Sequence, residues 1–190
     1  MNSYHGKVLR FIGMTVLSGL VAASLAPASF AVLGALGATI LGACTPNTGL
    51  DMSKPLSDGT WTAQSNPDDQ GSIGTITITV EGGRITATSY ETTLADGTDK
   101  GADYGKNSSG EVFNQDYYKK AQAAVASYQE YSDNLTQVGD PAKVDVITGA
   151  TVAHQQFVQA AIRAIAAAQG VSPDGADDID IPGLNDSTKD

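Results

Sequence analysis

The chain has 190 residues and a formal net charge of −10, from 11 basic and 21 acidic residues. Binding to nucleic acid requires a cationic face, which this composition cannot build, so we predict no nucleic-acid partner. A single cysteine, Cys44, excludes an intramolecular disulfide and a cysteine-rich metal site, and the two histidines, His5 and His154, are too few for a histidine-rich one.

The first 43 residues have the composition of a secretory signal peptide. Lys7 and Arg10 precede an uncharged, mostly apolar stretch over residues 11–41, and no further basic residue occurs before Lys54. This charge bias places the N-terminus in the cytoplasm and the remainder outside. An uncleaved transmembrane helix is the less favoured interpretation, because the stretch is longer than a bilayer span requires and Pro27 interrupts it.

The apolar stretch ends in a short motif that resembles a bacterial lipobox: Leu41, Gly42, Ala43 and Cys44. The resemblance implies that a signal peptidase cleaves before Cys44. It also implies that the thiol carries a diacylglyceryl group with fatty acyl chains such as palmitate. We therefore expect a lipid anchor in the bilayer and a location at the extracytoplasmic face of the cell membrane. Residues 44–57 lack apolar periodicity. We expect them to form the lipidated cysteine and a flexible tether after it.

The folded domain is expected over residues 58–170, which is long enough for one hydrophobic core. Three segments alternate polar and apolar residues with the period of a strand: 60–64, 74–80 and 84–93. Gly82 and Gly83 supply a hairpin turn between the second and third. Consecutive strands joined by short turns predict an antiparallel sheet with one covered face.

A long polar loop over residues 94–110 separates these strands from two predicted helices. The first spans Phe113 to Leu135, where apolar and aromatic residues recur every three or four positions. The members of this stripe, which we expect to face a core, are Tyr117, Ala121, Ala124, Tyr128, Tyr131 and Leu135. The second helix is alanine-rich and spans residues 151–170, and the β-branched run 143–147 before it is expected to be extended.

The predicted fold class is α+β, a small antiparallel β-sheet packed against two main α-helices in a single domain. Residues 171–190 contain six acidic residues and two prolines. Such a segment buries too little apolar surface to offset its ordering entropy, so we expect a disordered acidic C-terminal tail.

Residues 145–151, with the sequence Asp-Val-Ile-Thr-Gly-Ala-Thr, lie where the β-branched run meets the second helix. Thr148 is a favourable N-cap residue, and Gly149 permits a tight turn. The first N–H groups of a helix lack partners, and the helix dipole makes that end attractive to phosphate. On these grounds alone, an ordinary capped helix is the favoured interpretation.

The segment resembles the flavinylation motif of the FMN-binding domain family, in which Asp, two variable residues, Ser or Thr, Gly, Ala and Thr follow in order. In that family a flavin transferase attaches FMN through its phosphate to the final Thr. The resemblance implies covalent FMN on Thr151, with Asp145, Thr148, Gly149 and Ala150 at the other fixed positions.

The resemblance extends over residues 58–169. Residues 58–61, Asp-Gly-Thr-Trp, resemble the opening of the family's domain, and residues 74–85 resemble its hairpin. The chain departs from the pattern at Ala153 and His154, where Thr and Ser or similar residues often follow the motif.

The family includes flavin subunits of membrane redox pumps and small lipoproteins of extracellular electron transfer. The polar loop is not of the proline-containing type seen in the pump subunits. This difference favours the lipoprotein role. The resemblance implies an electron carrier rather than a stand-alone enzyme, served by a membrane electron donor such as a quinone-linked dehydrogenase. FMN suits this role because it exchanges one electron or two.

In the polar loop, Lys100, Tyr104 and Lys106 are candidate flavin contacts, with solvated side chains as the alternative. We expect His154 to face solvent, with a phosphate contact as the alternative. We expect Trp61 to pack in the core, with stacking on the flavin as the alternative. Two other functions stay open, a non-redox ligand-binding surface lipoprotein and a lipoprotein precursor that releases a pheromone-type peptide from its signal peptide.

Overall fold

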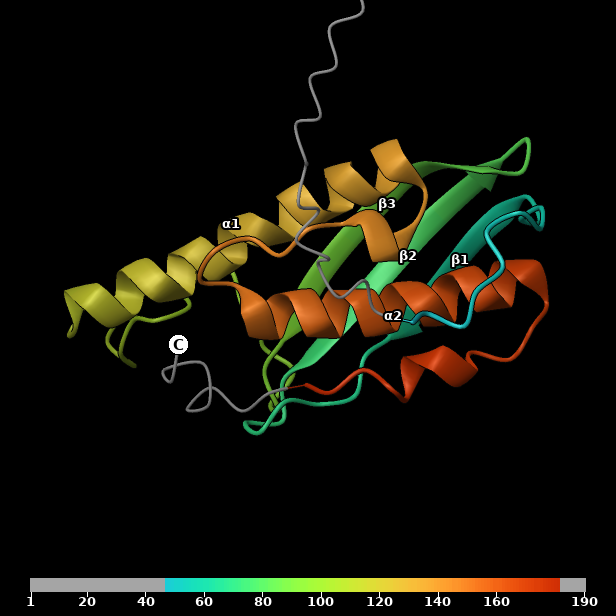
Figure 1. Ribbon diagram of the computed structural model, residues 1–190. Helices are drawn as coiled ribbons and strands as arrows, with labels where there is room; N and C mark the ends of the chain where they lie inside the picture. The colour runs from blue at the N-terminus through green and yellow to red at the C-terminus, as the bar shows by residue number, and fades with distance from the viewer. Residues whose placement is uncertain (1–46, 182–190) are drawn as a thin grey trace, which may run out of the picture. The chain divides into compact units, whose positions relative to one another are not determined.

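A computed structural model describes residues 47–181. In chain order the elements are β1 (Gly59–Gln64), β2 (Ile73–Glu81), β3 (Arg84–Thr93), α1 (Gln115–Val138), the 3-10 turn η1 (Pro141–Lys143), α2 (Thr151–Gln169) and the 3-10 turn η2 (Asp174–Ala176). The strands form an antiparallel sheet, and both long helices lie on the same face of it, α1 over β3 and α2 over β1 and β2 (Figure 1). The predicted α+β fold class is confirmed.

The sheet has one covered face, as its sequence alternation predicted. Ile76, Ile78 and Val80 on β2 are buried beneath the helices. The threonines between them face away from the helices, where the Thr62 and Thr77 hydroxyls lie 2.9 Å apart across neighbouring strands. Trp61 is opposite Ile78 and packs against the core, as expected.

The hairpin between β2 and β3 turns at Gly82 and Gly83, as predicted. Their φ angles of 59° and 76° lie in the left-handed region, which glycine adopts without steric cost. Asp58 accepts a hydrogen bond from the Gly83 N–H at 2.9 Å, so the residue directly before β1 also stabilises this turn.

Helix α1 begins two residues later and ends three residues later than the predicted helix, which spanned residues 113–135. Asn114 caps it, accepting from the N–H groups of Asp116 and Tyr117, and Gly139 ends it with a φ of 68°. Within the stripe, Tyr128 and Tyr131 are buried in the core, but Tyr117 is 49% exposed. The difference arises because the first turns of α1 extend beyond the sheet (Figure 1).

Helix α2 starts at Thr151, as predicted, and ends at Gln169, one residue before the predicted end. Buried residues occur on every side of it: Ala153, His154, Gln156, Phe157, Val158, Gln159, Ala160, Ala161, Ile162, Ala164, Ile165, Ala166 and Ala168. A helix buried all round needs cover on the side that the sheet does not reach.

Part of that cover comes from residues 47–57, which we expected to be a flexible tether. Thr48 and Leu56 are buried, the Ser57 N–H donates to the Ala168 carbonyl at 2.8 Å, and the Gln169 amide donates to the Asp51 carbonyl at 2.9 Å. The tether prediction is therefore wrong for residues 47–57. The signal peptide, Cys44 and the rest of the predicted tether lie outside the described residues.

The remainder comes from residues 171–181, which we expected to be disordered. Ala176 and Ile179 are buried, and the Gln159 amide donates to the Ala176 carbonyl at 2.9 Å. Arg163 pairs with Asp177 at 2.9 Å. The prediction of a disordered tail is wrong for residues 171–181, because α2 offers these few apolar residues a surface to bury against. Residues 182–190 lie outside the described residues.

Among residues 47–181, no helix has both the length and the apolar character of a membrane span.

Candidate functional site

The loop between η1 and α2, residues 144–150, carries most of the predicted motif. Val144 is extended, with φ and ψ of −90° and 109°, but within residues 47–181 the run 143–147 forms no strand, and Lys143 belongs to η1. The Ala150 N–H donates to the Ile147 carbonyl at 2.9 Å and closes a turn. Gly149 has a φ of 81° within this turn, a conformation that favours glycine.

The structure brings the predicted site residues of the motif together on this one loop and the helix start that follows it. Asp145, Thr148, Gly149 and Thr151 are exposed, and Ala150 is buried beneath them. Thr151 is the first residue of α2, so its exposed hydroxyl lies at the helix N-terminus.

The N-cap of α2 is Ala150 and not Thr148, which corrects one prediction. The positive φ of Gly149 separates Thr148 from the helix, and among the described residues no side chain caps α2. The first backbone N–H groups of the helix therefore have no side-chain acceptor, and the dipole favours negative charge at this end. Within residues 47–181 the Thr151 hydroxyl has no hydrogen-bond partner either. An exposed hydroxyl beside an uncapped helix end fits a group attached through a phosphate.

His154 is buried, with 7% of its surface exposed, and this corrects the expectation that it faces solvent. Its Nε2 lies 2.7 Å from the Val144 carbonyl oxygen, and burial lowers the pKa of the imidazole. A sequence signal for this burial exists. His154 lies three positions before Phe157 and seven before Ala161, on the apolar face of the predicted helix.

Tyr131, on α1, also contacts the loop, and sequence reasoning missed this role. Its hydroxyl donates to the Ala150 carbonyl at 3.2 Å and accepts from the Ile147 N–H at 3.1 Å. The stripe of α1 placed Tyr131 in a core but gave no sign of which loop its hydroxyl meets.

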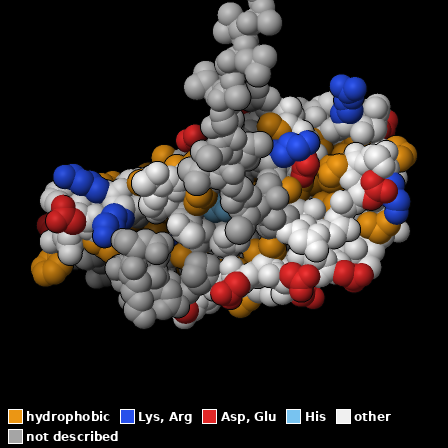
Figure 2. Space-filling view, viewed as in Figure 1, with side chains coloured by type: hydrophobic (Ala, Val, Ile, Leu, Met, Phe, Trp, Pro, Cys, Tyr) orange, Lys and Arg blue, Asp and Glu red, His pale blue; other side chains and the backbone are white. Residues whose placement is uncertain are grey.

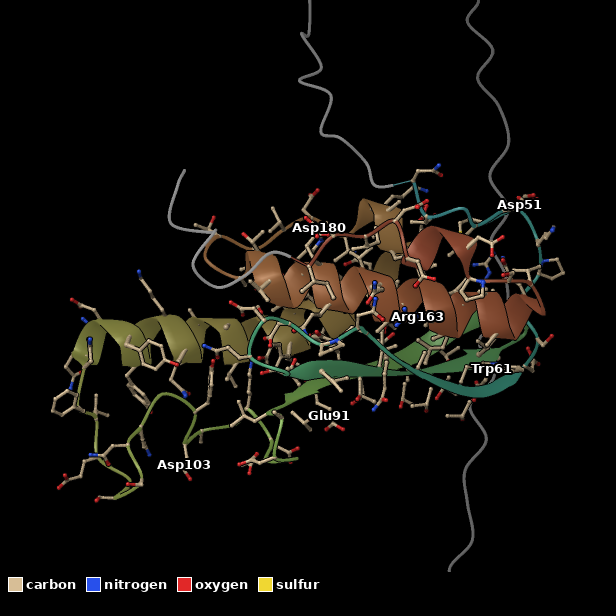
Figure 3. The ribbon with its side chains drawn as sticks, turned by 90° about the horizontal axis from the view of Figure 1, so that it is seen from below. Asp51, Trp61, Glu91, Asp103, Arg163 and Asp180 are labelled. Carbon is tan, nitrogen blue, oxygen red and sulfur yellow. The ribbon has the colours of Figure 1, made fainter. Side chains whose placement is uncertain are left out.

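Lys100 is buried, so the alternative of a solvated side chain is wrong for this residue. Its Nζ lies 3.4 Å from a carboxylate oxygen of Asp68 and 5.1 Å from the centre of the Tyr104 ring. Burial lowers the pKa of Lys100, and the Asp68 carboxylate opposes this shift. Lys106 pairs instead with Asp103 at 2.7 Å, in the loop that lies beside the first half of α1 (Figure 3).

The polar loop meets α1 and the end of β3 rather than the motif. The Gln122 amide of α1 donates to the Tyr104 carbonyl at 2.8 Å, and the Lys100 N–H donates to the Thr92 carbonyl at 2.8 Å. Within residues 47–181, no hydrogen bond or ion pair joins Lys100 or Tyr104 to residues 145–151. Their contact with a flavin stays a prediction.

The surface charges agree with the acidic composition. On the face seen in Figure 2, Lys and Arg side chains are scattered, and acidic side chains lie along the lower edge.

A hollow of about 380 Å³ lies between the β2–β3 turn and the end of α1, with Leu56, Arg84 and Val138 among its lining residues. No motif residue lines it.

No protein-family model matches the chain, and a search among curated proteins finds no match. A crystal structure of a protein from Clostridium perfringens is similar, with 24% identity, a TM-score of 0.49, and coverage of 60% of this chain and 90% of the other. A solution NMR structure of a protein from Clostridium thermocellum has 23% identity, a TM-score of 0.35, and coverage of 60% of this chain and 94% of the other. Likeness at this level indicates no function.

Proposed function

We propose that this chain is a membrane-anchored, extracytoplasmic flavoprotein that carries FMN covalently on Thr151 and passes electrons outside the cytoplasmic membrane. One observation carries the proposal. The Thr151 hydroxyl, last in a seven-residue segment that resembles a flavinylation motif, is exposed at the uncapped start of a long helix.

Attachment would be a phosphoryl transfer catalysed by a flavin transferase. The Thr151 hydroxyl oxygen forms a bond to the phosphorus of the FMN group and gives up its proton. With FAD as the donor, the phosphoanhydride bond to AMP breaks and AMP leaves, so the product is a phosphodiester and no group is oxidised or reduced. The N–H groups and dipole of the first α2 turn favour the negative charge that stays on this phosphate.

Bound FMN would supply the exchange of one or two electrons between a membrane donor, such as a quinone-linked dehydrogenase, and an acceptor outside the cell. The loop before α2 holds the attachment point at the surface, where a partner has access to it. A covalent bond suits a carrier in this location, because a dissociated cofactor would be lost to the surroundings.

The docking of residues 47–57 bears on the proposed anchor. Thr48 is buried against the domain, only four residues after Cys44. Four extended residues reach ~14 Å at most. A lipid on Cys44 would therefore hold the domain closer to the bilayer than a flexible fourteen-residue tether, whose root-mean-square reach is ~20 Å.

The test is mass spectrometry of the full chain co-expressed with a flavin transferase. We expect wild type to gain the mass of one FMN less one water, on the peptide that contains Thr151. Thr151→Val removes the hydroxyl with little change in shape and should abolish the gain. Thr60→Val makes the same change at another exposed position and should keep it. A wild-type chain that gains no flavin overturns the proposal and favours a non-redox ligand-binding lipoprotein.

A further inference from the structure

Two buried side chains hold the loop that presents Thr151. Tyr131 reaches it from α1, and His154 reaches it from α2; their exposed fractions are 0% and 7%. The two rings lie against one another, with centroids 5.4 Å apart. We refer to this pair as the Tyr131–His154 clamp.

Tyr131 fixes the end of the loop that leads into α2. Its single hydroxyl accepts from the Ile147 N–H at 3.1 Å and donates to the Ala150 carbonyl at 3.2 Å. The same Ala150 carbonyl accepts the first helical hydrogen bond, from the His154 N–H at 2.9 Å. The start of the helix and the turn before it are thus joined through one phenol, whose donor and acceptor capacity are both used.

His154 fixes the opposite end. Its Nε2 lies 2.7 Å from the Val144 carbonyl oxygen, and because a carbonyl only accepts, Nε2 carries the hydrogen in this contact. Among the described residues, the buried Nδ1 has no hydrogen-bond partner. Within residues 47–181, the bond to Val144 is therefore the one hydrogen bond of the imidazole ring. Val144 lies directly before Asp145, the first residue of the motif.

The clamp acts on the inner side of the loop and leaves its outer side free. Val144 and Ala150 are buried, whereas Asp145, Thr148 and Thr151 are exposed. A loop that is ordered before it meets an enzyme loses less conformational entropy on binding than a disordered one. We propose that Tyr131 and His154 are positioning residues that hold residues 144–150 in the conformation in which a flavin transferase accepts Thr151. This inference rests on the proposed function.

Tyr90 offers a matched control for Tyr131. It is also buried, its hydroxyl also donates to a carbonyl of the first turns of α2, that of Ala153 at 3.2 Å, and its ring also packs on Phe157. Within residues 47–181, its hydroxyl makes no hydrogen bond to residues 144–150. Tyr131→Phe and Tyr90→Phe therefore remove the same atom from the same core, and only the first should release the loop.

The first measurement is steady-state flavin transfer to the purified full chain in detergent, with a flavin transferase and FAD. Loss of a net hydrogen bond corresponds to about a fivefold effect. Tyr131→Phe removes two hydrogen bonds to the loop. We therefore expect it to raise the KM for the chain by at least about fivefold at unchanged kcat, because ordering of the loop is lost before binding. Tyr90→Phe should leave both constants unchanged. Equal effects of the two substitutions, or no effect of Tyr131→Phe, would overturn the inference.

The second set of variants tests His154 by rescue. His154→Leu should raise the KM in the same way, because it leaves the Val144 carbonyl without its donor. His154→Gln retains an N–H donor at a similar reach and should restore most of the wild-type KM. If Gln and Leu behave alike, the hydrogen bond to Val144 has no positioning role.

Hydrogen exchange of the Ile147 amide tests the clamp without any flavin. Exchange should be faster in Tyr131→Phe than in wild type and unchanged in Tyr90→Phe. If wild type takes up no flavin, the proposed function fails, and this exchange still decides whether the clamp holds the loop. Unchanged exchange in Tyr131→Phe would overturn the clamp, whatever the flavin content.

Discussion

Burial favours the neutral form of the His154 imidazole in the folded chain. Burial lowers its pKa, although the Val144 carbonyl and the nearby Asp145 carboxylate favour the charged form. Protonation would place a charge in a buried site where, among the described residues, Nδ1 lacks a partner. The cost of that charge links the stability of the fold to pH.

We expect the free energy of unfolding to fall as the pH drops below 6.5. The His154 pKa is lower in the folded than in the unfolded state, so between the unfolded value of 6.5 and the folded value the unfolded chain binds more protons. His154→Gln removes this contribution, and its stability should change less with pH across that window. Urea denaturation at several pH values measures the difference, since all carboxylates are common to both chains. Parallel curves for the two chains would contradict a lowered His154 pKa.

Asp68 is a second buried group whose partners set its role. One carboxylate oxygen accepts from the N–H groups of Gln70 and Ser72 at 2.9 and 2.8 Å, and the other lies 3.4 Å from the Lys100 ammonium. The Asp68–Lys100 pair thus ties the loop before β2 to the polar loop after β3.

Removal of the Asp68 carboxylate should lower the free energy of unfolding more than removal of the Lys100 ammonium group. Asp68→Asn leaves a buried ammonium unpaired and should lower the free energy of unfolding by about 3 kcal/mol. Lys100→Met leaves a carboxylate that keeps its two backbone donors, and we expect a loss of about 1 kcal/mol. Urea denaturation of both single variants and the double variant gives the coupling. If Lys100→Met proves the more damaging, the assigned roles are wrong.

Helix α2 depends on contacts between two segments that are far apart in the sequence. Residues near Thr48 and residues of η2 meet beside it, and Gly175 lies so close that a Cβ there would overlap the Thr48 carbonyl. Gly101, in the polar loop, has open space around its Cα. Neither glycine has a positive φ, so both accept an alanine backbone.

Gly175→Ala should therefore destabilise the chain, and Gly101→Ala should not. The new methyl group forces the two segments apart, at a cost of about 1–3 kcal/mol. Urea denaturation measures the loss, and limited proteolysis near residue 175 should become faster. Equal stability of the two variants would show that these segments do not pack as described.

The strands and helices could be predicted because their periodicity is local. Residues 74–80 alternate strictly, and the run of alanines and isoleucines after Thr151 repeats at helical spacing. The cap at Ala150 could not be predicted, because it depends on the conformation of Gly149. Covering segments such as 171–181 were missed because one or two apolar residues in an acidic stretch give no periodic signal.

The candidate site was likewise predicted only in part. The motif identified Thr151 and its neighbours, since they are contiguous in the chain. The roles of Tyr131 and His154 depend on the packing of α1 against α2, which no sequence spacing specifies. Lys100 was expected to face a flavin or water, and its pairing with Asp68 joins residues 32 positions apart.

Over the whole described chain, the two end segments close the core around α2. Deletion of residues 171–190 would expose the α2 surface beneath Ala176 and Ile179 and remove the acceptors of the Gln159 amide. Deletion of residues 182–190 keeps all of these contacts.

A chain that ends at Gly170 should be less stable than one that ends at Ile181. We expect a loss of about 2 kcal/mol, the contribution of one buried aliphatic side chain less its ordering entropy. Urea denaturation of both truncated chains beside the full chain measures it. Equal stability of the two truncated chains would mean that residues 171–181 contribute no packing energy.

The most direct test of the central claim is intact mass spectrometry of this protein from its native host, followed by mapping of the modified peptide. The proposal predicts one FMN, less one water, on the peptide that contains Thr151, in addition to the lipid on Cys44. A chain that carries its lipid and no flavin would contradict it.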